Sequence, residues 1–142
     1  MPTYICTIAP NRFSDTQKTA VADAITRIHS EEGKAPAYLV HVLFNEVSPS
    51  NRYINRRQVS ADDIWIHGHI RAGRTDEQKA ALATRMTAEC AEAFGVESSF
   101  VWAYISDLAK AVEFGSLLPA PGEEKEWFDS IPQHVKERYG LS

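Results

Sequence analysis

The sequence predicts an α/β (α+β) fold in which two tandem βαβ units form a four-stranded sheet with two helices on one face. The first supporting observation is an internal repeat: the string SDTQK, which begins at Ser14, returns 61 positions later as TDEQK at Thr75. The second is that strand-like apolar stretches flank each of the helices that these strings begin. Because a right-handed crossover makes the two strands of a unit parallel, two related halves can build one sheet.

Both helices have recognisable start and stop signals. Each repeated string is typical of a capping box, in which a hydroxyl accepts a hydrogen bond from the backbone three residues on and a glutamine reaches back. Ser14 and Thr75 are therefore the expected N-caps. Apolar residues at helical spacing follow each cap, and Gly33 and Gly95 are expected to end the two helices in the left-handed conformation. The strands are expected at 3–8, 38–45, 64–70 and 100–106.

The length of 142 residues fits a single domain, 1–142. Its repeat halves are expected at about 2–48 and 62–106, with a C-terminal extension at 107–142. The segment between the halves is rich in turn-forming residues and has room for a short hairpin around Tyr53 and Ile54. In the extension, the string LLPAPGEEKEWFDS predicts a turn followed by a short helix.

Composition excludes several classes of protein. A hydrophobic content of 44% with 24% charged residues is ordinary for a globular protein, and no apolar run approaches the length of a membrane span. The net charge of -4 argues against a general nucleic-acid binder. No secretory signal is recognisable, and Cys6 and Cys90 lack a CxxC spacing, which favours buried free thiols. We therefore expect a cytoplasmic protein without a nucleic-acid or membrane partner.

The second face of the predicted sheet has no helix to cover it. The strands are nevertheless apolar on both faces, as Ile64 and Trp65 illustrate for the third strand. An uncovered apolar sheet face indicates association with another surface. We therefore predict a homo-oligomer in which the subunits pack their sheets together and functional residues lie near subunit boundaries.

Pro2 is the first residue with a candidate chemical role. Removal of Met1 would leave Pro2 with a free secondary amine, which can act as a nucleophile or a base. The alternative is that the proline only opens the first strand, a position at which proline is tolerated.

A candidate anion site follows the third predicted strand. Arg71 and Arg74 lie in a short loop that leads into the second helix, where guanidinium groups and exposed backbone amides are suited to a carboxylate. The alternative is two solvated arginines. His29 lies near the end of the first helix, on or beside its buried stripe, so that it is either a ligand-binding group or a packed histidine.

Two further residues, Tyr104 and Glu113, are candidates for a chemical role. Glu113 lies between apolar neighbours in AKAVEFGSLL, an environment typical of a general base, and the alternative is a glutamate in an exposed turn. Tyr104 lies on the fourth strand, where an aromatic residue is usually part of the core. His67 and His69 share one strand face and could form a metal pair, but no third ligand is evident, so no metal site is predicted.

Taken together, the candidate residues and seven strings resemble one known family. The sequence resembles the tautomerase superfamily, and within it the cis-3-chloroacrylic acid dehalogenase group, over nearly its whole length. The strings are MPTY, AITRIH, AYLVHVLFNE, IWIHGHIRAGRTDEQK, VWAYISD, VEFG and LLPAPGEEKEWFDS. This resemblance implies the tautomerase fold of paired βαβ units, assembled as a homotrimer, with no metal or organic cofactor.

The resemblance also implies a role for each candidate residue. Pro2, once Met1 is removed, would be the catalytic amino-terminal proline. Tyr104 and Glu113 would position and activate water for attack on the carbon β to the substrate carboxylate. The residues that the resemblance assigns to binding the carboxylate and polarising the double bond are His29, Arg71 and Arg74.

The function implied is that of a cofactor-independent hydrolytic dehalogenase or hydratase of small unsaturated carboxylic acids similar to cis-3-chloroacrylate. One alternative is a keto-enol tautomerase of 2-oxo acids of the phenylpyruvate type, and another is a decarboxylase of malonate semialdehyde type. A third alternative, from another class, is a non-catalytic trimeric protein that binds a metabolite without converting it. The sequence leaves these alternatives open.

Overall fold

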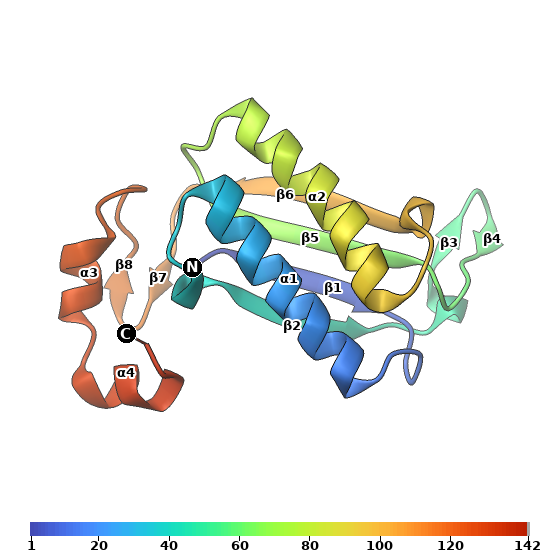
Figure 1. The fold of residues 1–142 in the computed structure, drawn as a ribbon, viewed down its shortest axis with the longest axis horizontal. Coiled ribbons are helices and arrows are strands. Elements are labelled where there is room, and N and C mark those ends of the chain that lie inside the picture. The colour runs from blue at the N-terminus through green and yellow to red at the C-terminus, as the bar shows by residue number, and fades with distance from the viewer. Residues whose placement is uncertain (142) are drawn as a thin grey trace.

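The computed structural model describes residues 1–141 and shows a four-stranded sheet covered on one face by two long helices (Figure 1). In chain order, the first two strands of this sheet are parallel to each other, as are the last two, and the two halves meet where the first strand pairs antiparallel with the third. This arrangement confirms the predicted fold of two βαβ units in one sheet. In sheet order, the strands are β2 (His41–Glu46), β1 (Thr3–Ile8), β5 (Ile64–Arg71) and β6 (Val101–Leu108).

The two long helices begin as the sequence predicts. The side chain of Ser14 accepts a hydrogen bond from the backbone of Gln17, and Thr75 accepts one from Gln78, so that both capping boxes are present. Neither long helix, nor any other helix within residues 1–141, is long and apolar enough to cross a membrane. The long helices are α1 (Asp15–Gly33) and α2 (Asp76–Phe94).

Only one of the two long helices ends as predicted. Gly95 caps α2 with a φ of 74°, in the left-handed region. At the end of α1, Gly33 is still helical and Lys34 takes the left-handed conformation, with a φ of 51°. The physical reason for a glycine at position 33 is instead steric, since a Cβ atom there would lie 3.1 Å from Nε2 of His29.

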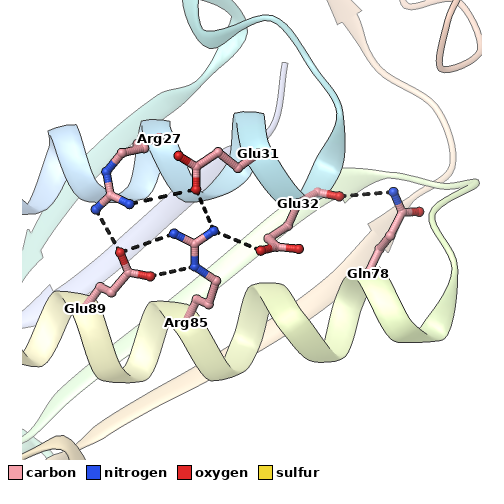
Figure 2. Close-up of polar contacts among 6 residues, drawn as sticks. All are labelled: Arg27, Glu31, Glu32, Gln78, Arg85 and Glu89. Carbon is pink, nitrogen blue, oxygen red and sulfur yellow. Dashed lines mark hydrogen bonds and ion pairs between the residues drawn. The ribbon is translucent and has the colours of Figure 1, made fainter.

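A network of ion pairs joins the outer surfaces of α1 and α2 (Figure 2). Its centre is Arg85 of α2, which donates to carboxylates on both helices. These groups are only partly buried, so each ion pair alone contributes little to the stability of the fold. Because the guanidinium of Arg85 is shared by carboxylates of both helices, it holds α1 and α2 in one register. The members are Arg27, Glu31 and Glu32 of α1 with Arg85 and Glu89 of α2, and Gln78 donates to the carbonyl of Glu32 at 3.0 Å.

Two of the strands begin later than the sequence predicts. A 3-10 turn at Ala37–Leu39 delays β2 to His41, and another at Ser98–Phe100 delays β6 to Val101. In each turn, the backbone N–H that follows donates to the carbonyl three residues back instead of to a neighbouring strand. Residues 38–40 and 100 are therefore outside the sheet.

The main hydrophobic core lies between the sheet and the two long helices. Alternate residues of the strands point into it, and both cysteines are buried there as free thiols. The opposite sheet face is not covered by either long helix and exposes aromatic side chains, with Trp102 45% and Tyr104 48% exposed. Large members of the core are Tyr4, Ile25, Ile28, Ile66, Leu82, Met86 and Phe94.

The two ends of the sheet carry different additions (Figure 1). At one end lies the predicted hairpin between the halves, preceded by a 3-10 turn at Pro49–Asn51. The amino terminus and the C-terminal extension lie at the other end, where Leu39, Trp127 and Ile131 form a second buried cluster. The remaining elements are β3 (Tyr53–Ile54), β4 (Arg57–Gln58), β7 (Val112–Glu113), β8 (Ser116–Leu117), α3 (Glu124–Ser130) and α4 (Gln133–Tyr139).

Candidate active site

The amino terminus of the chain lies beside the hairpin of β7 and β8 (Figure 1). The α-ammonium group of Met1 forms an ion pair with the carboxylate of Glu113, whose side chain is 23% exposed. Burial lowers the pKa of this ammonium group; Glu113 opposes the shift, and the positive charge of Arg71 adds to it. Pro2 follows as a buried residue whose carbonyl accepts a hydrogen bond from the backbone of His41 at 2.9 Å. Glu113 is therefore a neighbour of the position that a processed amino terminus occupies.

A cleft of about 530 Å³ opens at this ion pair, enough for a small organic acid. One wall comes from the start of β1 and the segment before β2, and the other comes from the β7–β8 hairpin and the end of the chain. Glu113 is the carboxylate in a lining that is otherwise largely apolar and aromatic. The lining residues are Met1, Thr3, Tyr38, Val40, His41, Glu113, Phe114, Tyr139 and Leu141.

The sequence predicts that Arg71 lies in a loop, but in the structure Arg71 is the last residue of β5. The pairing of β5 with β6 continues as far as Arg71 opposite Leu108, which extends the strand by one residue. The side chain is buried, and its residue is only 7% exposed. Its Nη1 donates to the carbonyl of Pro119 at 2.8 Å, and its Nη2 forms an ion pair with Glu124. The C-terminal extension therefore fixes the position of this guanidinium.

Arg74 lies in the connection between β5 and α2, directly before the cap residue of α2. Its guanidinium donates to the carbonyl of Gly33 at 3.3 Å and to that of Arg71 at 3.4 Å. Burial and then the nearby charge of Arg71 lower the pKa of Arg74, which nevertheless keeps its charge at neutral pH. Two positive groups thus lie close together, as an anion site requires.

His29 lies within the same charged environment, but it is a neutral and fully buried side chain. Its Nδ1 is 2.7 Å from the hydroxyl of Tyr4, while its Nε2 is buried without a hydrogen-bond partner among residues 1–141. Burial, followed by the charges of Arg74 and Arg71, lowers the pKa of His29 to about 4. If the Tyr4 hydroxyl donates to Nδ1, the proton of the neutral ring is on Nε2, which is then a buried donor without a partner among residues 1–141.

The buried neutral state of His29 makes stability depend on pH. Unfolded histidine takes up a proton near pH 6.5, but folded His29 does so only near pH 4, so the unfolded state binds more protons between these values. Acidification through this window is therefore expected to lower the free energy of unfolding by about 3 kcal/mol through this residue alone. Urea unfolding at several pH values and fixed protein concentration measures the slope.

The matched control for this pH dependence is His29→Gln, which has no titrating group at position 29. The wild-type profile should be steeper than that of the variant between pH 6.5 and 4, since all other titrating groups are shared. Parallel profiles would show that His29 is not the source of the dependence.

Tyr104 is the one predicted site residue that lies apart from the others in this chain. In the sheet, Tyr104 of β6 lies opposite His67 of β5, and His67 lies opposite Ile5 of β1. The strand β5 therefore lies between Tyr104 and the strand that follows Pro2. Its side chain is on the uncovered face, with its ring 5.6 Å from that of Trp65, and lines a separate cleft of about 290 Å³. Within one chain, the structure thus brings Pro2, His29, Arg71, Arg74 and Glu113 to one end of the sheet, and leaves Tyr104 on the other face.

Two residues of the site region were not anticipated from the sequence. Tyr4 contacts His29, and its position two residues after Pro2 on the same strand face was a signal that could have identified it. Glu124 pairs with Arg71 across 53 positions of sequence. Glu124 is one of three acidic residues in GEEKEW, and no local pattern distinguishes it from the other two.

Comparisons with known proteins agree with this fold. Residues 1–130 match a family model described as "Putative oxalocrotonate tautomerase enzyme". No curated protein sequence matches the chain significantly.

Several solved structures resemble the chain. One is N1, a member of the cis-3-chloroacrylic acid dehalogenase (cis-CaaD) family, with 33% identity, a TM-score of 0.88, and coverage of 97% of this chain and 98% of the other. A malonate semialdehyde decarboxylase inhibited by 3-bromopropiolate has 25% identity and a TM-score of 0.68, with 92% and 99% coverage. A fused 4-OT described as an asymmetric trimer has 22% identity and a TM-score of 0.69, with 75% and 86% coverage, and shares the fold.

The family match and the similarity to N1 both extend over most of the chain, and they agree with the paired βαβ units of the sheet. They also agree with the resemblance found in the sequence strings. The chain therefore belongs to the tautomerase superfamily and is related to its cis-3-chloroacrylic acid dehalogenase group.

Proposed function

We propose that this protein is a cofactor-independent hydrolytic dehalogenase or hydratase of small unsaturated carboxylic acids, with Pro2 as its amino-terminal catalytic residue. The observation that carries the proposal is the ion pair between the chain's amino terminus and Glu113 inside a cleft of about 530 Å³. Removal of Met1 leaves an amine and a carboxylate at one end of the sheet, within reach of the positive charge of Arg71. The relation to a cis-CaaD family member supports the choice of reaction.

The arginines and His29 bind the substrate in this proposal. Arg71 and Arg74 hold the carboxylate and withdraw electron density from the conjugated double bond, which makes the β carbon electrophilic. His29 is suited to a neutral donor role because the lowered pKa keeps it uncharged, and its buried Nε2 has no partner among residues 1–141.

Glu113 and Pro2 carry the two proton transfers. Glu113 takes a proton from water, whose oxygen forms a bond to the β carbon, while protonated Pro2 gives its proton to the α carbon. Where the β carbon bears chlorine, the product is a chlorohydrin. Loss of chloride and of the hydroxyl proton from this chlorohydrin gives 3-oxopropanoate, so the overall step consumes one water and releases hydrogen chloride.

Tyr104 enters this mechanism from a neighbouring subunit. In its own chain it lies on the uncovered sheet face, opposite His67 and away from Glu113. An apolar sheet face of this kind favours association, and the related fused 4-OT is described as a trimer. We therefore propose a homotrimer in which the Tyr104 hydroxyl of one subunit orients the attacking water in the site of the next.

The test is incubation of Met1-free protein with cis-3-chloroacrylate, with chloride and 3-oxopropanoate both quantified. Both products are expected in equal amounts, and Glu113→Gln should reduce their formation because an amide cannot accept the proton from water. Bound substrate with no turnover would contradict the proposal and favour a non-catalytic metabolite-binding protein.

A keto-enol tautomerase of 2-oxo acids is the second candidate. It is favoured by the burial at the amino terminus, which lowers the pKa of the Met1 ammonium group and would likewise favour a neutral amine on Pro2 after processing. The two enzymes are distinguished with the enol form of phenylpyruvate, since tautomerisation needs no activated water. Conversion of phenylpyruvate that is lost in Pro2→Ala but kept in Glu113→Gln would identify the tautomerase.

A further inference from the structure

One of the two arginines of the site already holds a carboxylate of its own chain. The guanidinium of Arg71 forms an ion pair with Glu124, and the two side chains are only 8% and 15% exposed. The same guanidinium donates to the carbonyl of Pro119 at 2.8 Å. Two of its five N–H groups are therefore occupied by the C-terminal extension, and the others remain for further acceptors.

The position of Glu124 is itself fixed by its surroundings. Both carboxylate oxygens accept from the backbone N–H of Gly122, at 3.1 and 3.0 Å. Its helix, α3, is anchored by Trp127, which is 6% exposed and packs in the second buried cluster. Burial opposes ionisation of Glu124, but the bonds from Arg71 and Gly122 outweigh it and lower the pKa of the carboxyl group. Glu124 is thus a permanently charged part of the site.

This arrangement sets the charge that a ligand encounters. Arg71 and Arg74 bring two positive charges, and the carboxylate of Glu124 offsets one of them at direct contact. The field of Glu124 also reaches Arg74, whose pKa it raises against the effects of burial and of Arg71. The excess positive charge of the pair therefore matches one carboxylate of a ligand and not two.

We propose that Glu124 is a specificity-determining positioning residue, which fixes Arg71 and makes the site select monocarboxylates over dicarboxylates. The inference rests on the proposed function in one respect, namely that Arg71 and Arg74 bind the carboxylate of the substrate. Glu124 acts through Arg71 and has no part in the bond-making steps. Once Glu124 and the first carboxylate of a ligand have balanced the two arginine charges, a second carboxylate finds no positive partner in this partly buried site. The second carboxylate would therefore lose its hydration without compensation.

The test compares two ligands that differ by one charged group. Acrylate carries a single carboxylate, and maleate has a second one cis to the first, where cis-3-chloroacrylate has its chlorine. Titration calorimetry with Met1-free protein, at a pH at which both maleate groups are ionised, gives both dissociation constants. Wild-type protein is expected to bind acrylate at least about tenfold more tightly than maleate.

Glu124→Gln removes the charge while keeping the size of the side chain and an oxygen that can accept from Gly122. It should shift the ratio of the two dissociation constants about tenfold toward maleate. Glu126→Gln is the matched control, since it removes the same charge from an exposed position of the same helix and should leave the ratio unchanged. A uniform loss of affinity for both ligands, as expected from a structural role alone, would overturn the inference.

The wild-type protein tests the inference even if Glu124→Gln does not fold, because equal affinity for acrylate and maleate would overturn it. Failure of the proposed function has a different signature. Selectivity for acrylate without chloride release from cis-3-chloroacrylate would contradict the reaction and leave the role of Glu124 supported. No binding of either ligand would contradict the carboxylate site, and both proposals with it.

Discussion

Protein that retains Met1 is expected to convert substrate at least about a thousandfold more slowly than protein from which Met1 has been removed. The peptide bond to Met1 makes the nitrogen of Pro2 a tertiary amide, which can neither accept nor deliver a proton. The ammonium group of Met1 also pairs with Glu113, the proposed base, so that both proton-transfer groups are blocked by one residue. Mass spectrometry quantifies the two forms, and chloride release measures their activity.

The two forms can be obtained from cells that express the protein with and without an inhibitor of methionine aminopeptidase. Activity should increase in proportion to the fraction of processed chains and extrapolate to zero when none is processed. Pro2→Ala provides the control, because it is processed in the same way and yet has a primary amine. Full activity in preparations that retain Met1 would exclude Pro2 as the catalytic group.

Co-expression of Tyr104→Phe with Glu113→Gln is expected to restore activity that neither variant has alone. Each variant by itself should lose about a hundredfold in rate, because each lacks one of the groups that orient or deprotonate water. In mixed trimers, a site is complete when its own chain supplies Glu113 and the neighbouring chain supplies Tyr104. With equal amounts and random assembly, about a quarter of the sites meet this condition.

The expected rate is therefore about a quarter of the wild-type rate, measured as chloride release per subunit. The control is a mixture of the two variants purified separately as assembled proteins, which should stay inactive for as long as subunits do not exchange. A mixture assembled by co-expression that is no more active than the single variants would show that Tyr104 serves the site of its own chain.

The helices were predictable from the sequence because their signals are local. The capping boxes at Ser14 and Thr75 depend on contacts within three residues, and both are present in the structure. The end of α1 was not predictable in the same way. Gly33 suggested a left-handed stop, but it packs against the ring of His29, where a Cβ atom would be crowded, and Lys34 takes the left-handed conformation instead. The starts of β2 and β6 were misplaced because 3-10 turns precede both strands. In these turns, the backbone groups form hydrogen bonds within the turn instead of with a neighbouring strand.

In the candidate site too, local features were predictable from the sequence, whereas contacts between distant residues were not. Local features made Pro2 and Glu113 candidates and the family resemblance gave them roles, and the structure brings the amino terminus and Glu113 together. No sequence pattern could reveal that Glu124 holds Arg71, because the pair is 53 positions apart and depends on how α3 docks. The separation of Tyr104 from the other residues likewise depends on which sheet face it occupies and on what covers that face.

The contact between Met1 and Glu113 joins residues 112 positions apart and has a consequence for the order of folding during synthesis. The four strands of the sheet end at Leu108, so the sheet can form before the β7–β8 hairpin has left the ribosome. Until that hairpin docks, Glu113 cannot shield the amino terminus. We therefore expect Met1 to be removed most readily from the nascent chain, before its ammonium group can pair with Glu113.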